Sequence, residues 1–562
     1  MTFAPAAGPP LAELPYNPHA IDVARDWPRV IGDVVGSLPA FAAELVVCAV
    51  IVALLLSRLF GLSKWLPAGT VAFLGSAIAT AVACLQWADA FETPGDAWAG
   101  LVRNDSLTVF VRVLVLLGWN LTVTLTVLTG VPRPSADPND DDGPDFHVPL
   151  AGVALGSVLM GQANHLLMLF LAVEMASVPA YVLVGFRKGS REAGEAALKY
   201  LVFGAGAAAV MMYGASLLAG ATGTLSLPAL GERLALVPLD GLGWETPGVG
   251  GAAVAGAVFV LCGLAFKLSL FPFHFWSPDA FQGALAEVSG FLSVAPKIGA
   301  FALLVRFGLG LNGDFGETGD QLLTGIGLAC AAAAAVSMTF GNLAAFAQKD
   351  LGRLLAYSTV AQSGTVLLGV AACFVGVGRG EPGLAEAGLA GTLLYLIAYL
   401  FLNLGAFAAV AVFRNRTLRT DVASLAGLGT KMPWIAGCFA VSLVGLVGLP
   451  PTAGFVGKLA VFAAALSDRE GAPLLFLCGG IAAANTVASL FYYFRPIRSL
   501  YLDSPPADRV AADRVAATPA RPPVTGSERA FLVLLAAPTI GILLLFSRLG
   551  TLCEAIAEAT LR

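Results

Sequence analysis

Four of the eight lysines lie inside long apolar segments, where a charged side chain is most costly to place. They are Lys199, Lys267, Lys297 and Lys458, and Glu174 is a fifth charge of this kind. Lysine can lose its proton when it is buried, whereas arginine stays charged. Each such charge costs about 2.5–3.5 kcal/mol to insert near the middle of a membrane span, so water or an opposite charge must offset it. These residue types at these places predict groups that bind and release protons.

The chain that positions these groups is too apolar to be a soluble protein. It has 562 residues, of which 57% are hydrophobic and 12% are charged, with a net charge of −5 and a mean hydropathy of +0.81. Soluble proteins carry about 25% charged residues. The composition therefore excludes a soluble enzyme, a nucleic-acid-binding protein and a disordered protein, and it predicts a multi-pass membrane protein surrounded by the lipid bilayer.

We expect no metal or cofactor site in this chain. The eight cysteines are far apart, with no Cys-x-x-Cys pair and no cluster with histidine, which argues against iron–sulfur, zinc and haem sites. The acidic run at 131–147 lacks the ligand spacing of a calcium loop. No basic residue precedes Arg25, so we also expect no cleavable signal peptide.

Apolar runs of about 20 residues predict an all-α fold with about fourteen transmembrane helices. The runs are continuous and rich in Leu, Ala and Gly, unlike the alternating strands of a membrane β-barrel. When the connections are assigned alternately to two sides, most of their Lys and Arg residues fall on the odd-numbered side, which predicts that this side is cytoplasmic and that both termini lie outside. The predicted spans are 37–57, 68–88, 106–129, 148–162, 164–185, 194–220, 248–271, 286–309, 321–345, 351–378, 384–413, 432–466, 473–494 and 530–547.

The seventh and twelfth predicted spans are both interrupted by proline or glycine, and both carry a lysine close to the interruption. Lys267 stands five residues before Pro272, and Lys458 follows Pro450 and Pro451 in the segment LPPTAGFVGK. Broken helices at matching places in two halves are typical of transporters built from inverted repeats. The carbonyls that a break frees need water or polar side chains as partners. We therefore predict two inverted repeats, discontinuous spans 7 and 12, and a hydrated proton path lined by lysines.

Two of the charges lie deep in their predicted spans. Glu174 is about ten residues from either end, too far for a short side chain to reach the interface, although a satisfied core carboxyl is an alternative. Lys297 follows Glu287, near the start of the eighth span, by ten residues, which is about 15 Å along a helix. That depth favours a role in proton transfer over a structural one.

Structural explanations stay open for other candidates. Lys267 could reach the interface from its place near the helix break. Lys199 stands four residues after Glu195, and an ordinary i,i+4 ion pair explains it nearly as well as a place on a proton path. His274, in the segment FPFHFW, is equally a proton relay or a partner for the freed carbonyls.

The same pattern divides the chain into seven segments. They are 1–36, an N-terminal extramembrane segment; 37–130, the first three transmembrane helices; 131–147, an acidic cytoplasmic loop; 148–310, a first repeat of spans 4–8; 321–497, a second repeat of spans 9–13; 498–529, a Pro-rich cytoplasmic linker; and 530–562, the last transmembrane helix with the C-terminus.

Several segments between about 170 and 460 resemble the antiporter-like membrane subunits of respiratory complex I. They read LFLAVEMASVPAYVLVGFR, EAALKYLVFGA, GLAFKLSLFPFHFWSPDAFQGA, FLSVAPKIGAF, QKDLGRLLAYSTVA, YLFLNLGAFA and LVGLPPTAGFVGK. The FLSVAPK and EAALKY forms are most similar to subunit N. Lys458 contrasts with the Glu that is typical of subunit M, and we expect no counterpart of the long lateral helix of subunit L after the last span.

The resemblance implies a fold of fourteen spans in two repeats with discontinuous helices, and it implies roles for single residues. Glu174 and Lys267 match a coupling pair of carboxylate and lysine, and Lys297 matches a lysine on the central axis. Lys458 matches the lysine that leads to the outer half-channel, and Lys199 matches a further lysine on the sixth helix.

The resemblance also implies a proton-translocating membrane-arm subunit of an NADH–quinone oxidoreductase, in the inner (cytoplasmic) membrane of the cell. Its partners would be the other membrane-arm subunits. NADH, FMN, the iron–sulfur clusters and quinone would bind in partner subunits, with no cofactor here. A subunit of an Mrp-type sodium/proton antiporter is an alternative, and a structural scaffold that has lost transport is a third, which the cost of five intramembrane charges disfavours.

Two departures from the family pattern bear on the predicted path. Where GAPTPVTAFLS is usual, this chain has GALAEVSGFLS, which places Glu287 at the start of the eighth helix. Where AYSSIAHxG is common, it has AYSTVAQSG, so that Gln362 replaces a histidine. An amide cannot carry a proton at neutral pH, and Glu287 or water would have to substitute for that relay step.

Overall fold

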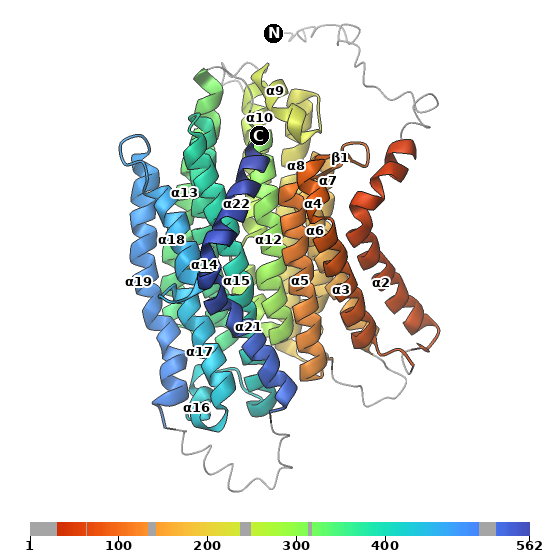
Figure 1. Ribbon diagram of the computed structural model, residues 1–562, viewed down its shortest axis with the longest axis vertical. Helices are drawn as coiled ribbons and strands as arrows, with labels where there is room; N and C mark the ends of the chain where they lie inside the picture. The colour runs from red at the N-terminus through yellow and green to blue at the C-terminus, as the bar shows by residue number, and fades with distance from the viewer. Residues whose placement is uncertain (1–30, 63–64, 133–141, 237–248, 313–316, 505–523) are drawn as a thin grey trace, which may run out of the picture.

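The computed structural model describes residues 31–62, 65–132, 142–236, 249–312, 317–504 and 524–562. Its long helices run side by side along the longest axis of the molecule (Figure 1). Three predicted segments lie partly outside the described residues, namely 1–30 of the N-terminal segment, 133–141 of the acidic loop and 505–523 of the Pro-rich linker.

The N-terminal part holds three long helices and a short hairpin. Its elements are α2 (Ala42–Leu59), α3 (Ala68–Leu85), α4 (Trp87–Glu92), β1 (Gly95–Ala97), β2 (Val102–Asn104) and α5 (Ser106–Thr129). The two strands are antiparallel, and such three-residue strands are too short to show an alternating pattern in the sequence. α5 begins where the side chain of Asp105 accepts a hydrogen bond from the Thr108 N–H, and it ends at Gly130, whose φ of 67° suits a residue without a Cβ.

The next seven helices include the first interrupted span. They are α6 (Asp142–Gln162), α7 (Leu166–Val184), α8 (Arg191–Thr222), α9 (Leu227–Ala235), α10 (Val249–Lys267), α11 (Trp276–Gly283) and α12 (Ala286–Gly310). α6 begins at Asp142 instead of the predicted 148, so the last residues of the predicted acidic loop are helical. The carboxylates of Asp142 and Asp145 in the first turn favour this start, because the N-terminal end of a helix carries partial positive charge.

The following helices include the second interrupted span. They are α13 (Glu317–Phe346), α14 (Leu351–Gly378), α15 (Pro382–Thr417), α16 (Leu428–Lys431), α17 (Pro433–Val447), α18 (Ala453–Ala465) and α19 (Pro473–Tyr501). The predicted break at Pro450 and Pro451 separates α17 from α18. α14 and α15 approach closely, since a Cβ on Gly388 would lie 2.6 Å from the Cys373 backbone nitrogen.

The chain ends in two consecutive helices where one was predicted. α21 (Gly526–Leu544) covers most of the predicted span 530–547, and α22 (Phe546–Leu561) continues along α15 (Figure 1). The apolar runs of the sequence did not predict α22, because this helix is amphipathic. Cys553, Ile556 and Ala557 are buried, whereas Glu554 and Glu558 are exposed.

Twelve helices in the described residues are long and apolar enough to cross a membrane, which confirms a helical multi-pass membrane fold. α6 and the pair α17–α18 occupy the other two predicted spans, and the count of fourteen stays a prediction. The two inverted repeats also stay a prediction, although α7 and α14 begin alike. His165 and Asp350 cap these helices, and each forms an isolated bridge to a residue beyond the following helix, to Ser226 and to Asp421.

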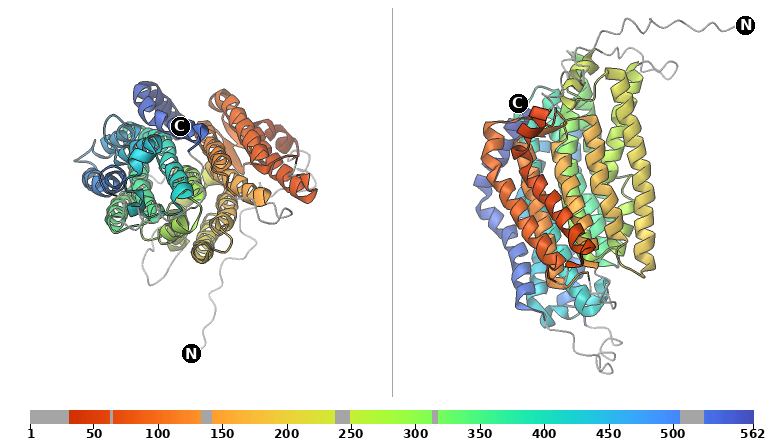
Figure 2. Two further views of the ribbon diagram at one scale, coloured as in Figure 1. Left: turned by 90° about the horizontal axis from the view of Figure 1, so that it is seen from below. Right: turned by 90° about the vertical axis from the view of Figure 1, so that its right-hand side faces the viewer.

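The most buried helices are α12, α14 and α15. In the most apolar 18-residue stretch of each helix, 100% of the residues of α12 are buried, as are 94% of those of α14 and 89% of those of α15. In α2, α8 and α19 about one third or less are buried. The N-terminal helices α2 and α3 lie on one side of the molecule and α19 on the other, whereas the last two helices, α21 and α22, lie between them against α15 and α5 (Figure 2). The three central helices are therefore the ones that can hold a path away from lipid.

Candidate functional site

The first break lies directly after Lys267, which is the last residue of α10. The chain then turns until α11 begins at Trp276. Two of the carbonyls near this helix end have polar partners: the Trp276 Nε1–H donates to Phe266 O at 2.9 Å, and the Lys297 ammonium donates to Leu268 O at 2.9 Å. The break thus creates acceptors for a buried charge, as the sequence predicted.

Lys267 is held by a neutral hydroxyl instead of a carboxylate. Its Nζ donates to Ser177 Oγ on α7 at 2.9 Å, while Ser177 donates to Val173 O at 2.6 Å. Glu174 stands three residues before Ser177 on the same helix and is half-buried. In the part of the chain that the structure describes, no hydrogen bond or ion pair joins Glu174 to Lys267. The predicted pair therefore interacts electrostatically, with no hydrogen bond or ion pair between the two described side chains.

Lys297 lies at the centre of the buried site. It extends from α12 to Leu268 O and also donates to Ser363 Oγ on α14 at 2.8 Å. The exposed fractions of Lys267, Lys297 and Lys458 are 2%, 1% and 5%, so all three ammonium groups are inside the protein.

Lys458 binds the second break. α17 ends at Val447, and the Lys458 ammonium, which comes from α18, donates to Leu446 O at 2.8 Å and to Val447 O at 3.1 Å. The last carbonyls of a helix have no partner within the helix. Lys458 supplies one, and the amide of Gln362 supplies another by donating to Leu446 O at 2.8 Å.

Gln362 sits among buried hydroxyls between Lys297 and Lys458. The Tyr395 hydroxyl donates to Gln362 Oε1 at 2.5 Å, and Gln362 Nε2 donates to the Tyr493 hydroxyl at 3.0 Å. Tyr493 also shares a short hydrogen bond with Ser358. The sequence identified Gln362 as a position where a proton-carrying histidine is replaced, but it did not point to either tyrosine. The available signal was a tyrosine hydroxyl inside an apolar span.

These contacts place three lysines in one row that crosses the two broken helices. Neutral oxygens separate the charges. Three links are only closeness along the chain: Ser363 beside Gln362, Lys267 beside Leu268, and Glu174 three residues before Ser177. The row consists of Glu174, Ser177, Lys267, Leu268, Lys297, Ser363, Gln362, Leu446 and Lys458. Such an arrangement can bind protons at three points and move charge sideways through the membrane, with water completing the gaps.

Lys199 stands apart from this row. Its side chain is 43% exposed and pairs with Glu195 at 2.8 Å and with Asp279 at 2.9 Å, and Asp279 also binds Arg353. The i,i+4 ion pair that the sequence suggested is therefore present.

His274 and Glu287 are buried but are not bonded to the row in the described part of the chain. His274 packs against the rings of Phe271, Phe340 and Tyr357, and its Nδ1 has no hydrogen-bond partner there. In the described residues, the side chains that bind the freed carbonyls at this break are Trp276 and Lys297, and His274 does not. Glu287 occupies the first turn of α12, ten residues from Lys297.

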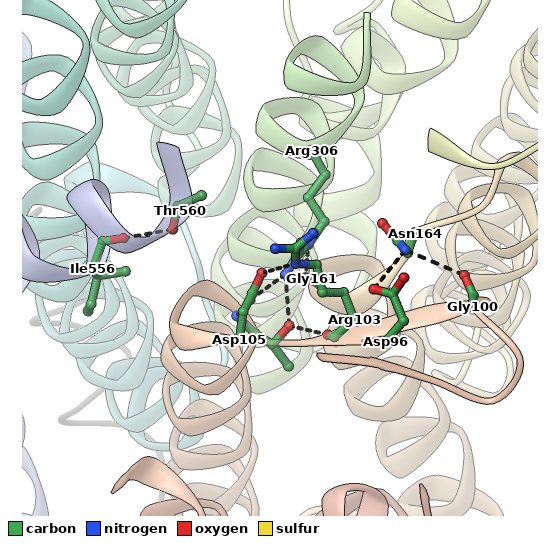
Figure 3. Close-up of polar contacts among 10 residues, drawn as sticks. Asp96, Gly100, Arg103, Asp105, Gly161, Asn164, Arg306, Ile556 and Thr560 are labelled. Carbon is green, nitrogen blue, oxygen red and sulfur yellow. Dashed lines mark hydrogen bonds and ion pairs between the residues drawn. The ribbon is translucent and has the colours of Figure 1, made fainter. Parts of the chain in front are cut away.

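A second polar cluster, which sequence reasoning missed, anchors the far end of α12 (Figure 3). Arg306 donates to Asp105 Oδ1 and to Gly161 O, both at 2.6 Å. Burial opposes ionisation of Asp105, but the charge and hydrogen bond of Arg306 outweigh it and hold the pKa of that carboxyl below its usual range. Asn164 and Asp96 bond beside this pair at 3.1 Å. The cluster ties the helix that carries Lys297 to α5 and to the end of α6.

Arg112, an arginine inside the third predicted span, has a buried partner on α2. Its Nε donates to Glu44 Oε1 at 2.7 Å, and both side chains are 1% exposed. Gln162, next to Gly161, also donates to Glu44. The ion pair thus joins α5 to α2 within the N-terminal part, and the neutral amide of Gln162 links Glu44 to α6.

Comparison with known proteins places this geometry in a family. The family model for the transmembrane part of NADH:quinone oxidoreductases and Mrp antiporters matches residues 163–482. NADH-quinone oxidoreductase subunit N 2 of Sorangium cellulosum is 35% identical over 519 residues, which cover 91% of this chain and 96% of the relative. Subunit N of an Anaeromyxobacter species is 37% identical over 422 residues, which cover 73% and 78%.

Two solved structures have similar folds. A chain of respiratory complex I from Thermus thermophilus with bound aureothin is 29% identical with a TM-score of 0.67, over 91% of this chain and 98% of that one. A chain of the Mrp complex from a Dietzia species has a TM-score of 0.75 at 20% identity, over 93% of this chain and 97% of that one, and this is a likeness of fold alone.

Proposed function

The chain belongs to the transmembrane family shared by NADH:quinone oxidoreductases and Mrp antiporters, and on that premise we propose that it is a proton-translocating membrane-arm subunit of an NADH–quinone oxidoreductase. The relatives that match most of its length carry the name of subunit N of that enzyme. The Mrp alternative is weaker, because the matched Mrp chain supports the fold only. The other membrane-arm subunits are its partners.

The observation that carries the proposal is the row of three buried lysines, whose hydrogen-bond partners among the described residues are all neutral oxygens. A buried ammonium held by a carboxylate is locked in its charged form, whereas one held by hydroxyls and carbonyls can release its proton more readily. Water is needed to complete the path, and the backbone carbonyls freed by both breaks are polar groups that water can also bind.

The mechanism begins at Glu174. Electron transfer to quinone elsewhere in the complex changes the charge near this carboxyl and alters its attraction for Lys267. When the two are apart, Ser177 holds the lysine, as in this structure. Lys458 first releases its proton to the outer side and becomes a neutral amine, which can accept a proton from Lys297. Neutral Lys297 in turn accepts a proton from Lys267. Repulsion between neighbouring ammonium groups favours the first release.

The proposal assigns the redox chemistry to other subunits. NADH, FMN, the iron–sulfur clusters and quinone bind there, and this chain contributes the proton path within the inner (cytoplasmic) membrane. In this scheme the chain moves protons and carries no electrons, so substitution of its lysines should change proton transport and not electron transfer.

The test is NADH-driven proton uptake into inverted membrane vesicles, with Lys297→Met compared with wild type. Methionine roughly keeps the length of the side chain and removes its charge. Lys188→Met is a matched control, because Lys188 is 65% exposed and pairs with Asp142 outside the row. We expect Lys297→Met to lose uptake while dye-linked NADH oxidation and assembly are unchanged. Full uptake in Lys297→Met would refute the proposal.

A further inference from the structure

The carbonyl of Leu446 accepts hydrogen bonds from two side chains that come from different helices. Lys458 Nζ lies 2.8 Å from this oxygen, and Gln362 Nε2 lies at the same distance. All three groups are buried. A carbonyl oxygen has two lone pairs, so both donors can bind at once, and each competes with the other for the same partial charge.

This carbonyl is one of the groups that hold the Lys458 ammonium in place. The described contacts of that ammonium are with Leu446 O and Val447 O, in the last turn of α17. The C-terminal end of a helix carries partial negative charge, which favours a cation there. Any group that takes part of this negative charge for itself weakens the hold on the lysine.

Gln362 cannot turn away easily, because its amide is oriented by two tyrosines. Tyr395 donates to Oε1, which leaves Nε2 to donate to Leu446 O and to the Tyr493 hydroxyl. Tyr395 is itself pressed against α18: a Cβ on Gly457, the residue before Lys458, would lie 2.7 Å from the Tyr395 ring. The amide N–H is therefore held toward the carbonyl that Lys458 uses.

We propose that Gln362 is a positioning residue for Lys458. Because Gln362 binds the same Leu446 carbonyl, it sets how readily Lys458 gives up its proton. This inference rests on the proposed proton path. Gln362 acts in two ways in the same direction. It weakens the bond from the ammonium to Leu446 O, and it keeps that oxygen bonded when Lys458 has let go, so the carbonyl is not left unpaired inside the membrane.

Removal of the Gln362 N–H should therefore make proton release from Lys458 harder. In Gln362→Met, Leu446 O serves Lys458 alone, and release to the outer side requires a more alkaline medium. One hydrogen bond is worth about one pH unit in such an equilibrium. We expect the pH profile of proton pumping to move upward by about that amount.

The experiment uses the assembled complex in inverted vesicles and measures protons pumped per NADH oxidised, with the pH varied equally on both sides. Gln362→Met is compared with Tyr492→Phe. Tyr492 is the buried neighbour of Tyr493, but its hydroxyl donates to Asn342 at 3.1 Å and not to Gln362. An alkaline displacement in Gln362→Met alone supports the inference. An unchanged profile, or an equal displacement in Tyr492→Phe, overturns it.

If Gln362→Met fails to assemble, Tyr395→Phe decides the question. It frees the amide to rotate away from Leu446 O, so a smaller displacement in the same direction supports the inference and none overturns it. Lys297→Met separates this inference from the proposed function. Full pumping in Lys297→Met refutes the function itself, whereas lost pumping there with a normal Gln362→Met profile refutes only the role of Gln362.

Discussion

Ser177 offers the sharpest test of how the Glu174–Lys267 pair works. Ser177 Oγ is the described hydrogen-bond acceptor of the Lys267 ammonium, at 2.9 Å. A hydrogen bond to a charged group contributes about 1.5–3 kcal/mol, so Ser177→Ala should make the arrangement in which Lys267 is separate from Glu174 roughly ten- to hundredfold rarer. If every turnover passes through that arrangement, NADH-driven pumping should fall at least about tenfold.

Ser157 provides a matched control on α6. Its Oγ donates to Val153 O at 2.6 Å, as Ser177 donates to Val173 O at 2.6 Å, and both serines are buried, but among the described residues no lysine is bonded to Ser157. The assay is proton uptake in inverted vesicles, normalised to dye-linked NADH oxidation. Equal uptake in Ser177→Ala and Ser157→Ala would refute the reasoning that a neutral hydroxyl holds the separated state.

Two further predictions concern groups outside the row. Lys199→Met should reduce pumping less than Lys297→Met does, because the Lys199 side chain is 43% exposed and its ion pairs with Glu195 and Asp279 lie outside the row; uptake in the same vesicles measures this. Arg306→Met should destabilise the protein by up to about 3–5 kcal/mol, because the buried carboxylate of Asp105 then keeps only the partly exposed Arg103, 3.2 Å away, as an ionic partner among the described residues; thermal unfolding in detergent measures this. The pKa of Asp105 is lower in the folded protein than in the unfolded chain, so its carboxylate stabilises the fold fully when the pH is above the pKa of the unfolded chain. This stabilisation is lost as the pH falls through the pKa of the folded protein. Acid should therefore destabilise wild type more than Asp105→Asn.

The contrary results are equally definite. A loss of uptake in Lys199→Met as large as in Lys297→Met would place Lys199 on the path despite its exposure. An unfolding temperature of Arg306→Met equal to that of wild type would show that the Asp105–Arg306 pair contributes nothing to anchoring α12. The same acid sensitivity in wild type and Asp105→Asn would show that Asp105 is not the group responsible.

The sequence was sufficient for the helical membrane fold because apolar runs report burial in lipid directly. It also located both breaks, since Pro272 and Pro450 with Pro451 cannot continue a helix. α22 was missed because its apolar residues occupy only one face, and the early start of α6 was missed because Asp142 and Asp145 interrupt the apolar pattern.

The site was predicted less completely than the fold. A charge in an apolar span is visible in a sequence, and this identified Lys267, Lys297 and Lys458, whose roles on the path stay proposals. The partners were not visible, because Ser177 and the tyrosines are ordinary residues whose meaning depends on what faces them. The sequence shows only that the Gln362 amide cannot carry a proton at neutral pH. Its contacts with Leu446 and two tyrosines exist only in the folded chain.

Two of the acceptors in the row, Leu268 O and Leu446 O, belong to the backbone. Every amino acid carries this oxygen, so no side-chain substitution at either position can delete it. Both leucines are buried, so an alanine scan would report the loss of their packing and not the role of this oxygen. Only exchange of the following amide bond for an ester, which weakens the carbonyl as an acceptor, would reveal that these positions hold a lysine. Part of the machinery of this protein is thus encoded in where its helices stop.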